Sequence, residues 1–419
     1  MFLGLKLSHN LVIGFYYMAN SNLTNAKRAK NDEFYTQYSD IQKEIEAYLE
    51  YNPHVFRDKV VYCNCDDPFE SNFFRYFVLN FNKLGLERLI TTSYKPSPVA
   101  NTQLGLFGDD KTLTKSKGRP KLTANKFIIN EVHDIDGDGE FNLKDVAKQL
   151  KANKHNEWTP LEGEGDFRSD ECVDLLKQSD IVVTNPPFSL FKEYVKQLFD
   201  YNKKFVIIGN KNSVTYKEIF PLIKDNKMWS GKTEWSGGLW FVTMDGTDVD
   251  KVIDGVNMKN VSSVWFTNLD HGRRHQPLPL MTMEENLKYS KHKEIKGKKT
   301  YDKYDNYDAI EVPFTDSIPS DYKGVMGVPI TFLDKYNPDQ FEILGATQRG
   351  CHDEVPDTKK YDDYWEVRQD GKKTGSSGGK TNENANLVAN DGKKNYFINK
   401  KGRIIQSAYQ RIFIRHKKK

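Results

Sequence analysis

The sequence predicts an α/β protein in which a doubly wound, mainly parallel sheet is followed by a region of mixed α+β structure. From about residue 39 to residue 275, short apolar runs typical of strands alternate with amphipathic runs typical of helices. This alternation indicates βαβ units, which place parallel strands in one sheet. After residue 275 the helix signals become sparse and Tyr, Lys, Pro and Gly are more frequent. The second part of the chain is therefore expected to fold differently.

The first expected helix, 39–51, shows how each element is justified. Ser39 stands three residues before Gln42, the spacing of a capping box, and Ile41 and Ile45 recur at a helical interval. Similar patterns predict the later elements. Strands are expected in 58–63, 87–94, 180–184, 203–209, 237–244 and 262–270, helices in 70–86, 170–179 and 189–199, and a strand, an acidic turn and a helix within 126–150.

Three regions are expected along the chain. Residues 1–22 are interpreted as a poorly structured N-terminal extension, because Met18 opens the polar sequence that follows. Residues 23–275 form the α/β domain, with an insertion near 95–126 where Pro, Lys, Thr and Gly break the alternation. Residues 276–419 form the mixed α+β region.

The charge of the chain is nearly balanced but unevenly distributed. Sixty-two Lys and Arg face 58 Asp and Glu, so the net charge of +4 does not by itself indicate a polyanionic partner. The segment Lys288–Lys303 is rich in lysine, and the chain ends in "RIFIRHKKK". The positive excess therefore leans toward the C-terminal half; a solvated face with a frayed tail is the alternative interpretation.

Cysteine usage and hydropathy bear on location. The four cysteines form neither a CxxC pair nor a disulfide framework, so we expect reduced thiols in a cytoplasmic protein. No run approaches the roughly 18 apolar residues of a membrane span, and no membrane association is expected. The cysteines are Cys63, Cys65, Cys172 and Cys351.

A rigid turn follows one of the expected strands. In "SDIVVTNPPFSLF" the apolar run ends in Asn185, Pro186, Pro187 and Phe188. Each proline fixes its own φ and lacks an N–H, so the pair belongs neither to a central strand nor to a helix interior. The turn would lie at the carboxyl end of the strand, where ligands bind in open parallel sheets.

The chemistry of this turn suits a planar amino group attached to a ring. The side-chain oxygen of Asn185 and the carbonyl of Pro186 can each accept one N–H bond, which frees the nitrogen lone pair. Phe188 can stack on the ring. A purely structural Asn-Pro turn is the alternative interpretation.

The four residues resemble motif IV, N-P-P-[FYW], of the S-adenosylmethionine-dependent amino-methyltransferases. The motif alone is shared by enzymes that methylate DNA, RNA and protein. The wider sequence resembles the EcoRI-type family of adenine-specific DNA methyltransferases, from about residue 31 to the C-terminus. The segments that carry this resemblance include "NDEFYTQYSDI", "GDFRSDE", "SSVWFTNLDH", "DNYDAIEVPFTDSIPSDYKGVMGVPITFLDKYNPDQFEILG" and "YQRIFIR".

The resemblance implies a Rossmann-like catalytic domain that binds S-adenosylmethionine in 23–275 and a target-recognition, DNA-binding region in 276–419. The expected reaction moves the methyl group to the exocyclic amino group of a flipped-out adenine in double-stranded DNA. The chain would be the modification enzyme of a restriction system, with a restriction endonuclease acting separately. Alternatively, it would be a methyltransferase without a partner endonuclease. No metal ion is required by this chemistry.

The resemblance also implies cofactor-binding residues. Phe34, Tyr35 and Thr36 correspond to the motif beside the methionine end of the cofactor. Asp166 and Phe167 look like the pair that hydrogen-bonds to and stacks on the cofactor's adenine.

The glycine-rich cofactor loop departs from the family pattern. Asp67 and Pro68 match its start, beside Asp66, but Ser71 and Phe73 stand where glycines are usual. The close backbone approach that glycine permits has to come from other groups near Cys65 and Asp66. The acidic residue that usually holds the ribose is also missing, since "TTSY" offers only hydroxyls, so that assignment stays open.

Two further motifs compete for a function. "DIDGDGEFNLKD" places Asp134, Asp136, Asp138 and Asp145 at ligand positions of a calcium loop, although an acidic turn is the alternative. "TGSSGGKT" has Thr374 where a phosphate loop requires glycine, so we expect a mobile loop there instead.

DNA contacts are expected in "VWFTNLDHGRRHQ". Trp265 or Phe266 could close the target pocket opposite Phe188, with core packing as the alternative. Arg273 and Arg274 could hold phosphates or read guanine edges.

Two other functions remain open from the sequence alone. The same turn serves amino-methyltransferases that act on RNA or on protein glutamine. Alternatively, the chain is a DNA-binding module whose cofactor site has decayed, an idea motivated by the missing glycines.

Overall fold

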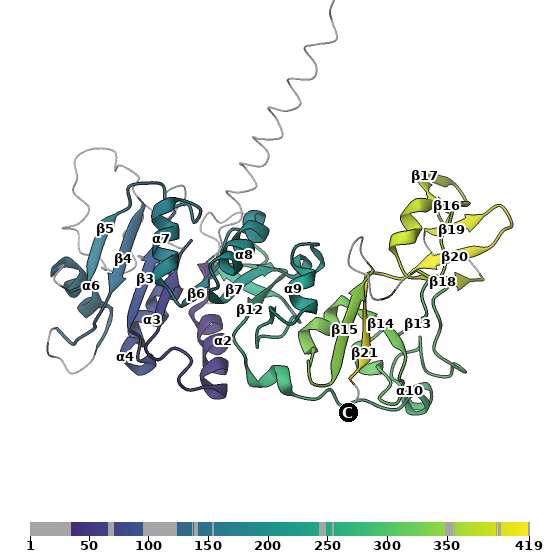
Figure 1. Ribbon diagram of the computed structural model, residues 1–419, viewed down its shortest axis with the longest axis horizontal. Coiled ribbons are helices and arrows are strands. Elements are labelled where there is room, and N and C mark those ends of the chain that lie inside the picture. Colours follow the sequence, from purple (N-terminus) through teal and green to yellow (C-terminus); the bar gives the residue numbers. More distant parts are fainter. Residues whose placement is uncertain are drawn as a thin grey trace, which may run out of the picture. The chain divides into compact units, whose positions relative to one another are not determined.

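In the computed structural model, which describes most of the chain, the chain forms two compact units (Figure 1). The first unit comprises the described residues up to Glu46, Pro53–Asn210 and Gly237–Ser263; the second comprises Ala47–Asn52, Lys211–Ser236 and the described residues from Val264 onward. The expected boundary at residue 275 stays a prediction, because compactness does not show which unit binds cofactor or DNA. The structure describes residues 35–65, 71–94, 124–135, 137, 141–152, 155–242, 249–253, 255–347, 355, 357–390, 392 and 395–417.

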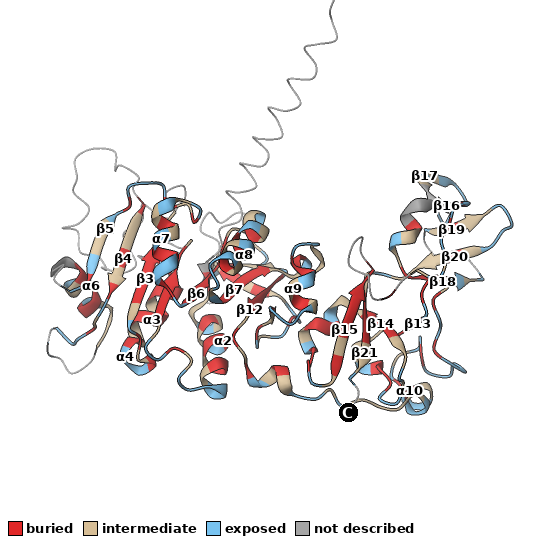
Figure 2. Cartoon of the chain, in the orientation of Figure 1, coloured by how far each residue is buried: buried red, intermediate tan, exposed pale blue. Residues whose placement is uncertain are grey.

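The first unit contains a mixed sheet whose strands follow the order β5-β4-β3-β2-β6-β7. Strands β2, β3, β6 and β7 run parallel, and β4 and β5 are antiparallel to their neighbours. The central strands β2 and β6 are buried along their whole length, as expected for strands covered on both faces (Figure 2). The strands are β2 (Val60–Cys63), β3 (Arg88–Thr92), β4 (Asn125–Ile129), β5 (Glu157–Pro160), β6 (Ile181–Thr184) and β7 (Lys204–Asn210).

The α/β class is confirmed, but the sheet is only partly parallel. Strand β5 was not expected, because its sequence "EWTP" is polar and its side chains are at most partly buried. The βαβ pattern predicts parallel neighbours joined by a helical crossover. Antiparallel strands need no such crossover, so the pattern could not predict that β4 runs antiparallel to β3. The expected insertion near 95–126 falls largely outside the described residues.

The strand expected in 237–244 is present, but it belongs to a second sheet of the first unit and not to the main sheet. β9 (Leu239–Val242) pairs antiparallel with β1 (Tyr35–Thr36) and with β11 (Val256–Val261), which pairs with β10 (Lys251–Ile253). Burial along β9 alternates, a pattern typical of an antiparallel sheet with one covered face.

The helices largely follow the sequence expectations. Helix α2 (Tyr38–Tyr51) begins one residue before Ser39, so Ser39 lies in the first turn instead of capping it. The helix expected in 70–86 is divided at Asn80. The other helical elements of the first unit are α3 (Asn72–Leu79), α4 (Phe81–Leu84), α6 (Leu143–Ala152), α7 (Asp170–Gln178), η1 (Phe188–Leu190) and α8 (Phe191–Asp200).

The second unit contains two further sheets. One has the order β13-β14-β21-β15 and the other the order β17-β16-β19-β20-β18, while β8 (Trp229–Ser230) pairs antiparallel with β12 (Ser263–Thr267). The strands are β13 (Ala309–Glu311), β14 (Val325–Pro329), β15 (Phe341–Ala346), β16 (Tyr364–Val367), β17 (Lys373–Ser377), β18 (Asn386–Ala389), β19 (Tyr396–Asn399), β20 (Ile404–Ser407) and β21 (Arg411–His416).

Short helical elements connect these strands. The mobile loop expected at "TGSSGGKT" is instead the end of β17 followed by η6, so that expectation is wrong. Within the described residues no helix is both long and apolar enough to cross a membrane. The elements are η2 (Lys211–Thr215), α9 (Phe220–Lys224), η3 (Gly272–His275), α10 (Met283–Tyr289), η4 (Thr315–Ser317), η5 (Ile330–Lys335) and η6 (Gly378–Glu383).

A buried ion pair joins β13 to β21 in the second unit. Arg411 donates to both carboxylate oxygens of Glu311, at 2.5 Å from Nη2 and 3.0 Å from Nε. The hydroxyl of Tyr304 donates to the same carboxylate. Only about a tenth of each charged side chain is exposed. Removing one partner would leave an uncompensated charge in the protein interior.

We therefore expect Arg411→Ala to destabilise the second unit by about 3–5 kcal/mol, because Glu311 would stay buried without its counter-ion. Arg415→Ala is the matched control: Arg415 lies on the same strand and pairs with Glu342 across the β15–β21 ladder, but both side chains are about two-fifths exposed. Its loss should cost less than about 1 kcal/mol. Urea unfolding followed by tryptophan fluorescence checks the difference. Equal midpoints for the two variants would contradict it.

Candidate active site at the carboxyl ends of two parallel strands

The N-P-P-F turn begins where β6 ends, beside the end of β2. The two strands are parallel neighbours, with Tyr62 opposite Val182. Two residues further along, the hydroxyl of Thr184 donates to the backbone carbonyl of Asn64. Because parallel strands end at the same edge of a sheet, the turn after β2 and the turn after β6 share one site. Asn64, which follows β2 and precedes the expected cofactor loop in the chain, therefore lies next to the strand end that leads into the expected catalytic motif.

Within this turn, burial divides the four residues into two pairs. Asn185 and Pro186 are buried, with 7% of Asn185 exposed, whereas Pro187 and Phe188 are partly exposed. Pro187 is extended, with φ −60° and ψ 123°, and precedes the short helix η1 that begins at Phe188. The motif thus changes the chain from strand to helix in three residues. Such a turn fixes an amide and a carbonyl at the strand end and leaves one aromatic ring accessible to a ligand.

Tyr194 joins three parts of this site. Its hydroxyl donates to the side-chain oxygen of Asn64 at 2.5 Å. Its ring meets that of Phe167 edge to face, with centroids 5.0 Å apart. Tyr194 lies in α8, the helix that continues from the N-P-P-F turn, and complete burial raises the pKa of its phenol well above the ordinary value. The hydroxyl therefore stays protonated and keeps donating to Asn64.

The expected adenine-binding pair lies in the loop before α7. Arg168 donates to both carboxylate oxygens of Asp166, from Nε at 2.9 Å and from Nη2 at 2.7 Å, and its backbone N–H adds a third bond. These hydrogen bonds lower the pKa of Asp166, so the group is a carboxylate at neutral pH. Phe167 is buried against Tyr194, and Gln197 of α8 donates to its carbonyl. The structure holds this loop against the helix of the catalytic motif.

Gly165 fixes the approach to Asp166. Its φ is +76°, and a Cβ atom there would overlap the carbonyl oxygen of Ser93 and lie 3.1 Å from the Cβ of Ala124. Only glycine fits this combination of a left-handed backbone and close contact. Gly163, two residues earlier, has open space around its α-carbon.

The N-terminal part of the expected cofactor site is described only in part. Asp66, Asp67 and Pro68 lie outside the described residues, as does Phe34, and for Tyr35 only the backbone is described. Thr36 is buried, and its carbonyl accepts a hydrogen bond from Asn72 at the start of α3. Ser71 caps α3 by accepting from the N–H groups of Phe73 and Phe74, so it has a structural role where the family has glycine.

Cys65 adopts a left-handed conformation directly after β2, with φ 71°. This conformation is uncommon for a residue other than glycine and occurs where the chain must turn sharply. Cys65 therefore makes a sharp turn directly after β2.

The calcium-loop positions are only partly described. Asp136 and Asp138 lie outside the described residues. Asp134 accepts the N–H of Gly137 at 2.8 Å, and the buried Asp145 accepts the N–H groups of Ile135 and Asn142 at 3.0 Å. These bonds close an acidic turn. Calcium binding stays untested, because two of the four ligand positions lie outside the described residues. Among the residues that the structure describes, no cluster of metal-ligating side chains is found.

The four residues expected to contact DNA are buried or paired. Trp265 and Phe266 are almost fully buried in β12, which favours the core-packing interpretation. Arg274 is 8% exposed, pairs with Asp270 at 3.3 Å and stacks over Trp229 at 3.8 Å. Arg273 pairs with Asp334 at 2.9 Å. The structure thus gives both arginines internal partners and offers no support for a contact with DNA.

Sequence reasoning missed the residues that hold the site together. Asn64, Arg168 and Tyr194 bear no motif of their own, and Asn64 and Tyr194 depend on each other across 130 positions of the chain. A signal existed for Arg168, two residues after Asp166. For Tyr194 the helical periodicity of α8 predicted burial, but burial of a tyrosine also requires a partner for its hydroxyl.

We expect Gly165→Ala to lower the stability of the first unit by at least about 2 kcal/mol, because a left-handed alanine would also collide with Ser93. Gly163→Ala, the control in the same loop, should change it by no more than about 0.5 kcal/mol. Differential scanning calorimetry of the two variants measures the effect. A Gly165→Ala protein that melts like the wild type would refute the close packing described here.

Comparison with known proteins identifies the family. The family described as "Adenine-specific methyltransferase EcoRI" matches residues 22–417. Type II methyltransferase M.EcoRI of Escherichia coli is 45% identical over 331 residues, covering 78% of this chain and 89% of the relative. Type II methyltransferase M.MpnI of Mycoplasma pneumoniae is 37% identical, covering 76% of this chain and 83% of the relative. No solved structure matches significantly. The chain belongs to the EcoRI family of adenine-specific methyltransferases.

Proposed function

We propose that the chain transfers a methyl group from S-adenosylmethionine to the exocyclic amino group of adenine in double-stranded DNA, with Asn185, Pro186, Pro187 and Phe188 as the catalytic motif. Family membership supports the methyltransferase reaction and its adenine specificity. The adjoining ends of β2 and β6 support the position of the site. The names of the relatives, Type II methyltransferases, support a modification role in a restriction system, in which an endonuclease would act separately.

The proposed catalysis depends on hydrogen-bond polarisation and positioning. An adenine amino nitrogen is a weak nucleophile, because its lone pair is delocalised into the ring. The Asn185 side-chain oxygen and the Pro186 carbonyl would each accept one of its hydrogens, which turns the lone pair out of conjugation. Preorganised acceptors of this kind lower the barrier without reorganising during the reaction. After transfer, the methylated nitrogen loses one proton toward Asn185 and solvent.

Phe188 would hold the target base. A base inside a duplex is inaccessible, so the adenine has to leave the stack before it can meet Asn185. The ring of Phe188 is partly exposed at the start of η1 and can pack against the face of the purine. Its place directly after two prolines restricts where that ring can lie.

The residues present fit the proposed cofactor. S-adenosylmethionine, when bound, supplies an electrophilic methyl group on a sulfonium. The ionised carboxylate of Asp166 can accept hydrogen bonds from an adenine amino group or a ribose hydroxyl. Tyr35 and Thr36 would lie beside the methionine end, with Asp66, Asp67 and Pro68 forming the loop after β2. In this proposal the parallel strands form the doubly wound, Rossmann-like arrangement that brings these segments together.

The burial of Phe167 refines its proposed role. Its ring already packs edge to face on Tyr194, so it has one face fewer available for stacking. We therefore propose that Phe167 supports the floor of the cofactor site while Asp166 supplies its polar contact.

The product of the reaction tests the function directly. Purified protein is incubated with plasmid DNA and methyl-labelled S-adenosylmethionine, the DNA is digested, and the labelled nucleoside is identified. We expect the label in N6-methyl-2′-deoxyadenosine. Label in a methylated cytosine, in RNA or only in protein would reject the proposed substrate.

We expect Asn185→Ala to reduce methyl transfer by at least about 100-fold, because one of the two preorganised acceptors is removed. Binding of DNA and S-adenosylmethionine should change little. Asn82→Ala, at an exposed position of α4 in the same unit, is the control and should retain full turnover. Single-turnover methylation measures the chemical step separately from binding. Undiminished turnover in Asn185→Ala would remove Asn185 from the mechanism.

A further inference from the structure

The positive charge of the chain is concentrated in one short segment of the second unit. Residues 288–299, "KYSKHKEIKGKK", contain six lysines and one glutamate. With His292 neutral, these twelve residues carry a net charge of +5, compared with +4 for the whole chain. We call residues 288–299 the lysine segment. The rest of the chain therefore carries a net charge of −1.

Exposure and pairing divide the six lysines into two classes. All six are exposed. Lys291 pairs with Asp316 at 2.8 Å and Lys298 pairs with Asp302 at 2.5 Å. Within the described part of the chain, Lys293, Lys296 and Lys299 form no ion pair. These three ammonium groups are available to an external anion.

The backbone beneath the lysines is fixed by buried contacts. Ser290 and Ile295 are buried, and the ring of His292 stacks on Phe314 with centroids 3.7 Å apart. The His292 carbonyl accepts the N–H of Lys296 at 2.9 Å, and the N–H of Gly297 bonds to Leu287 at 2.8 Å. The lysines therefore extend from an ordered scaffold, which reduces the entropy lost when they bind a partner.

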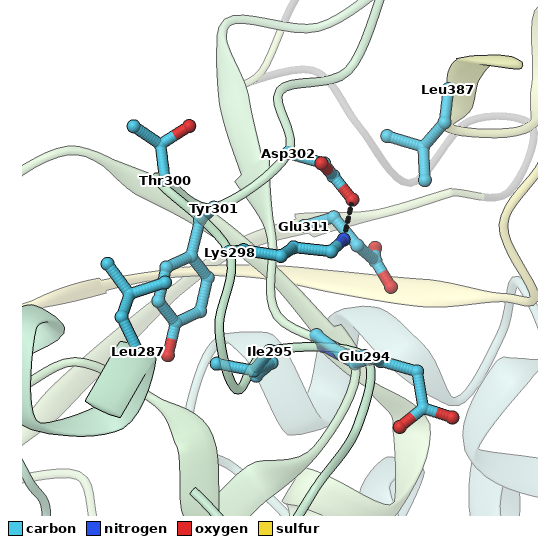
Figure 3. A pocket seen from close by; sticks show the side chains of 10 residues that line it. Leu287, Glu294, Ile295, Lys298, Thr300, Tyr301, Asp302, Glu311 and Leu387 are labelled. Atoms are coloured by element: carbon cyan, nitrogen blue, oxygen red, sulfur yellow. Dashed lines mark hydrogen bonds and ion pairs between the residues drawn. The ribbon is translucent and has the colours of Figure 1, made fainter. Parts of the chain in front are cut away.

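The lysine segment borders a pocket whose lining includes three carboxylates. It has a volume of about 190 Å³ and is lined by the carboxylates of Glu294, Asp302 and Glu311 (Figure 3). Lys298 lies across it toward Asp302, as the dashed line in Figure 3 shows. Glu311 is engaged by Arg411. This local arrangement keeps Lys298 engaged with protein and separates its role from that of Lys293, Lys296 and Lys299.

An exposed aromatic ring accompanies the charges. Tyr289, at the end of α10, is 61% exposed, and the ammonium group of Lys288 lies 5.0 Å from its ring centroid. Lysines that flank an exposed aromatic ring suit the sugar-phosphate backbone of a nucleic acid, where the ring packs on sugar and the amines meet phosphates.

We propose that the lysine segment binds the phosphate backbone of duplex DNA, with Lys293, Lys296 and Lys299 as the principal contacts. The proposal rests on the DNA methyltransferase function and identifies the surface that supplies affinity independent of base sequence. Each lysine that meets a phosphate releases a condensed counterion, so the contact appears in the salt dependence of binding. The expected occupant is DNA flanking the methylated base.

The test is the slope of log Kd against log salt concentration for the full chain on duplex DNA. Each lost contact removes roughly 0.9 from that slope, so K293Q/K296Q/K299Q should reduce it by about 1.5 to 2.7. At about 0.1 M salt the affinity should fall at least about tenfold, on specific and unrelated duplexes alike. In methyl-transfer assays the KM for DNA should rise by a similar factor, because the lost contacts hold the DNA substrate.

The matched control is K83Q/K144Q/K251Q, which removes three exposed lysines of the first unit. It changes the net charge equally but should leave the slope within about 0.5 of the wild type. An unchanged slope in the segment variant, or an equal decrease in the control, would overturn the proposal and leave a solvated face. A wild-type protein that binds DNA but transfers no methyl group would instead reject the proposed function, independently of the slopes.

Discussion

The parallel pairing of β2 with β6 is the constraint on which the candidate site depends. Both strands are entirely buried, so their register is fixed by packing on both faces. The bond from Thr184 to the carbonyl of Asn64 continues the pairing beyond the last regular ladder residues. A shift by one residue would move every side chain to the other face of the sheet. The turn after β6 can therefore meet the turn after β2 in one arrangement only.

Tyr194 shows how burial and polarity act together in this site. A buried hydroxyl without a partner costs about 1–3 kcal/mol, and here Asn64 supplies that partner. The same ring fills the space beside Phe167. One tyrosine thus connects the helix of the N-P-P-F motif, the turn of the expected cofactor loop and the loop that carries Asp166. Apolar packing positions the elements, and polar bonds such as that of Tyr194 to Asn64 set the relative placement of their ends.

The second unit uses its basic residues in two ways. Arg411 is buried against Glu311, and Arg274 is buried against Asp270 and Trp229, so these groups stabilise the fold. Arginine suits such positions because its planar group can bond to a carboxylate and stack on a ring at the same time. The exposed lysines of residues 288–299 are different, because several keep their charge toward solvent. Internal structure thus takes up Arg274 and Arg411, while Lys293, Lys296 and Lys299 stay exposed for the proposed contact with DNA.

By itself, the sequence determined the local features. The apolar run before Asn185 predicted β6, the two prolines predicted a strand-to-helix turn, and the helical periodicity after it predicted α8. These features depend on backbone stereochemistry and on side-chain spacing within a few residues. The resemblance of the wider sequence, from about residue 31 to the C-terminus, identified the family, which the comparisons confirmed.

Only the tertiary structure decided which distant residues meet. The sequence could not place β4 antiparallel to β3, assign β9 to a separate sheet, or pair Tyr194 with Asn64 across 130 positions. It also could not show that Arg273 and Arg274, adjacent and basic, are neutralised by Asp334 and Asp270. Strand direction, partner choice and burial all depend on contacts between segments that are remote in the chain. Their free energies arise only when the whole chain packs, so no local pattern records them.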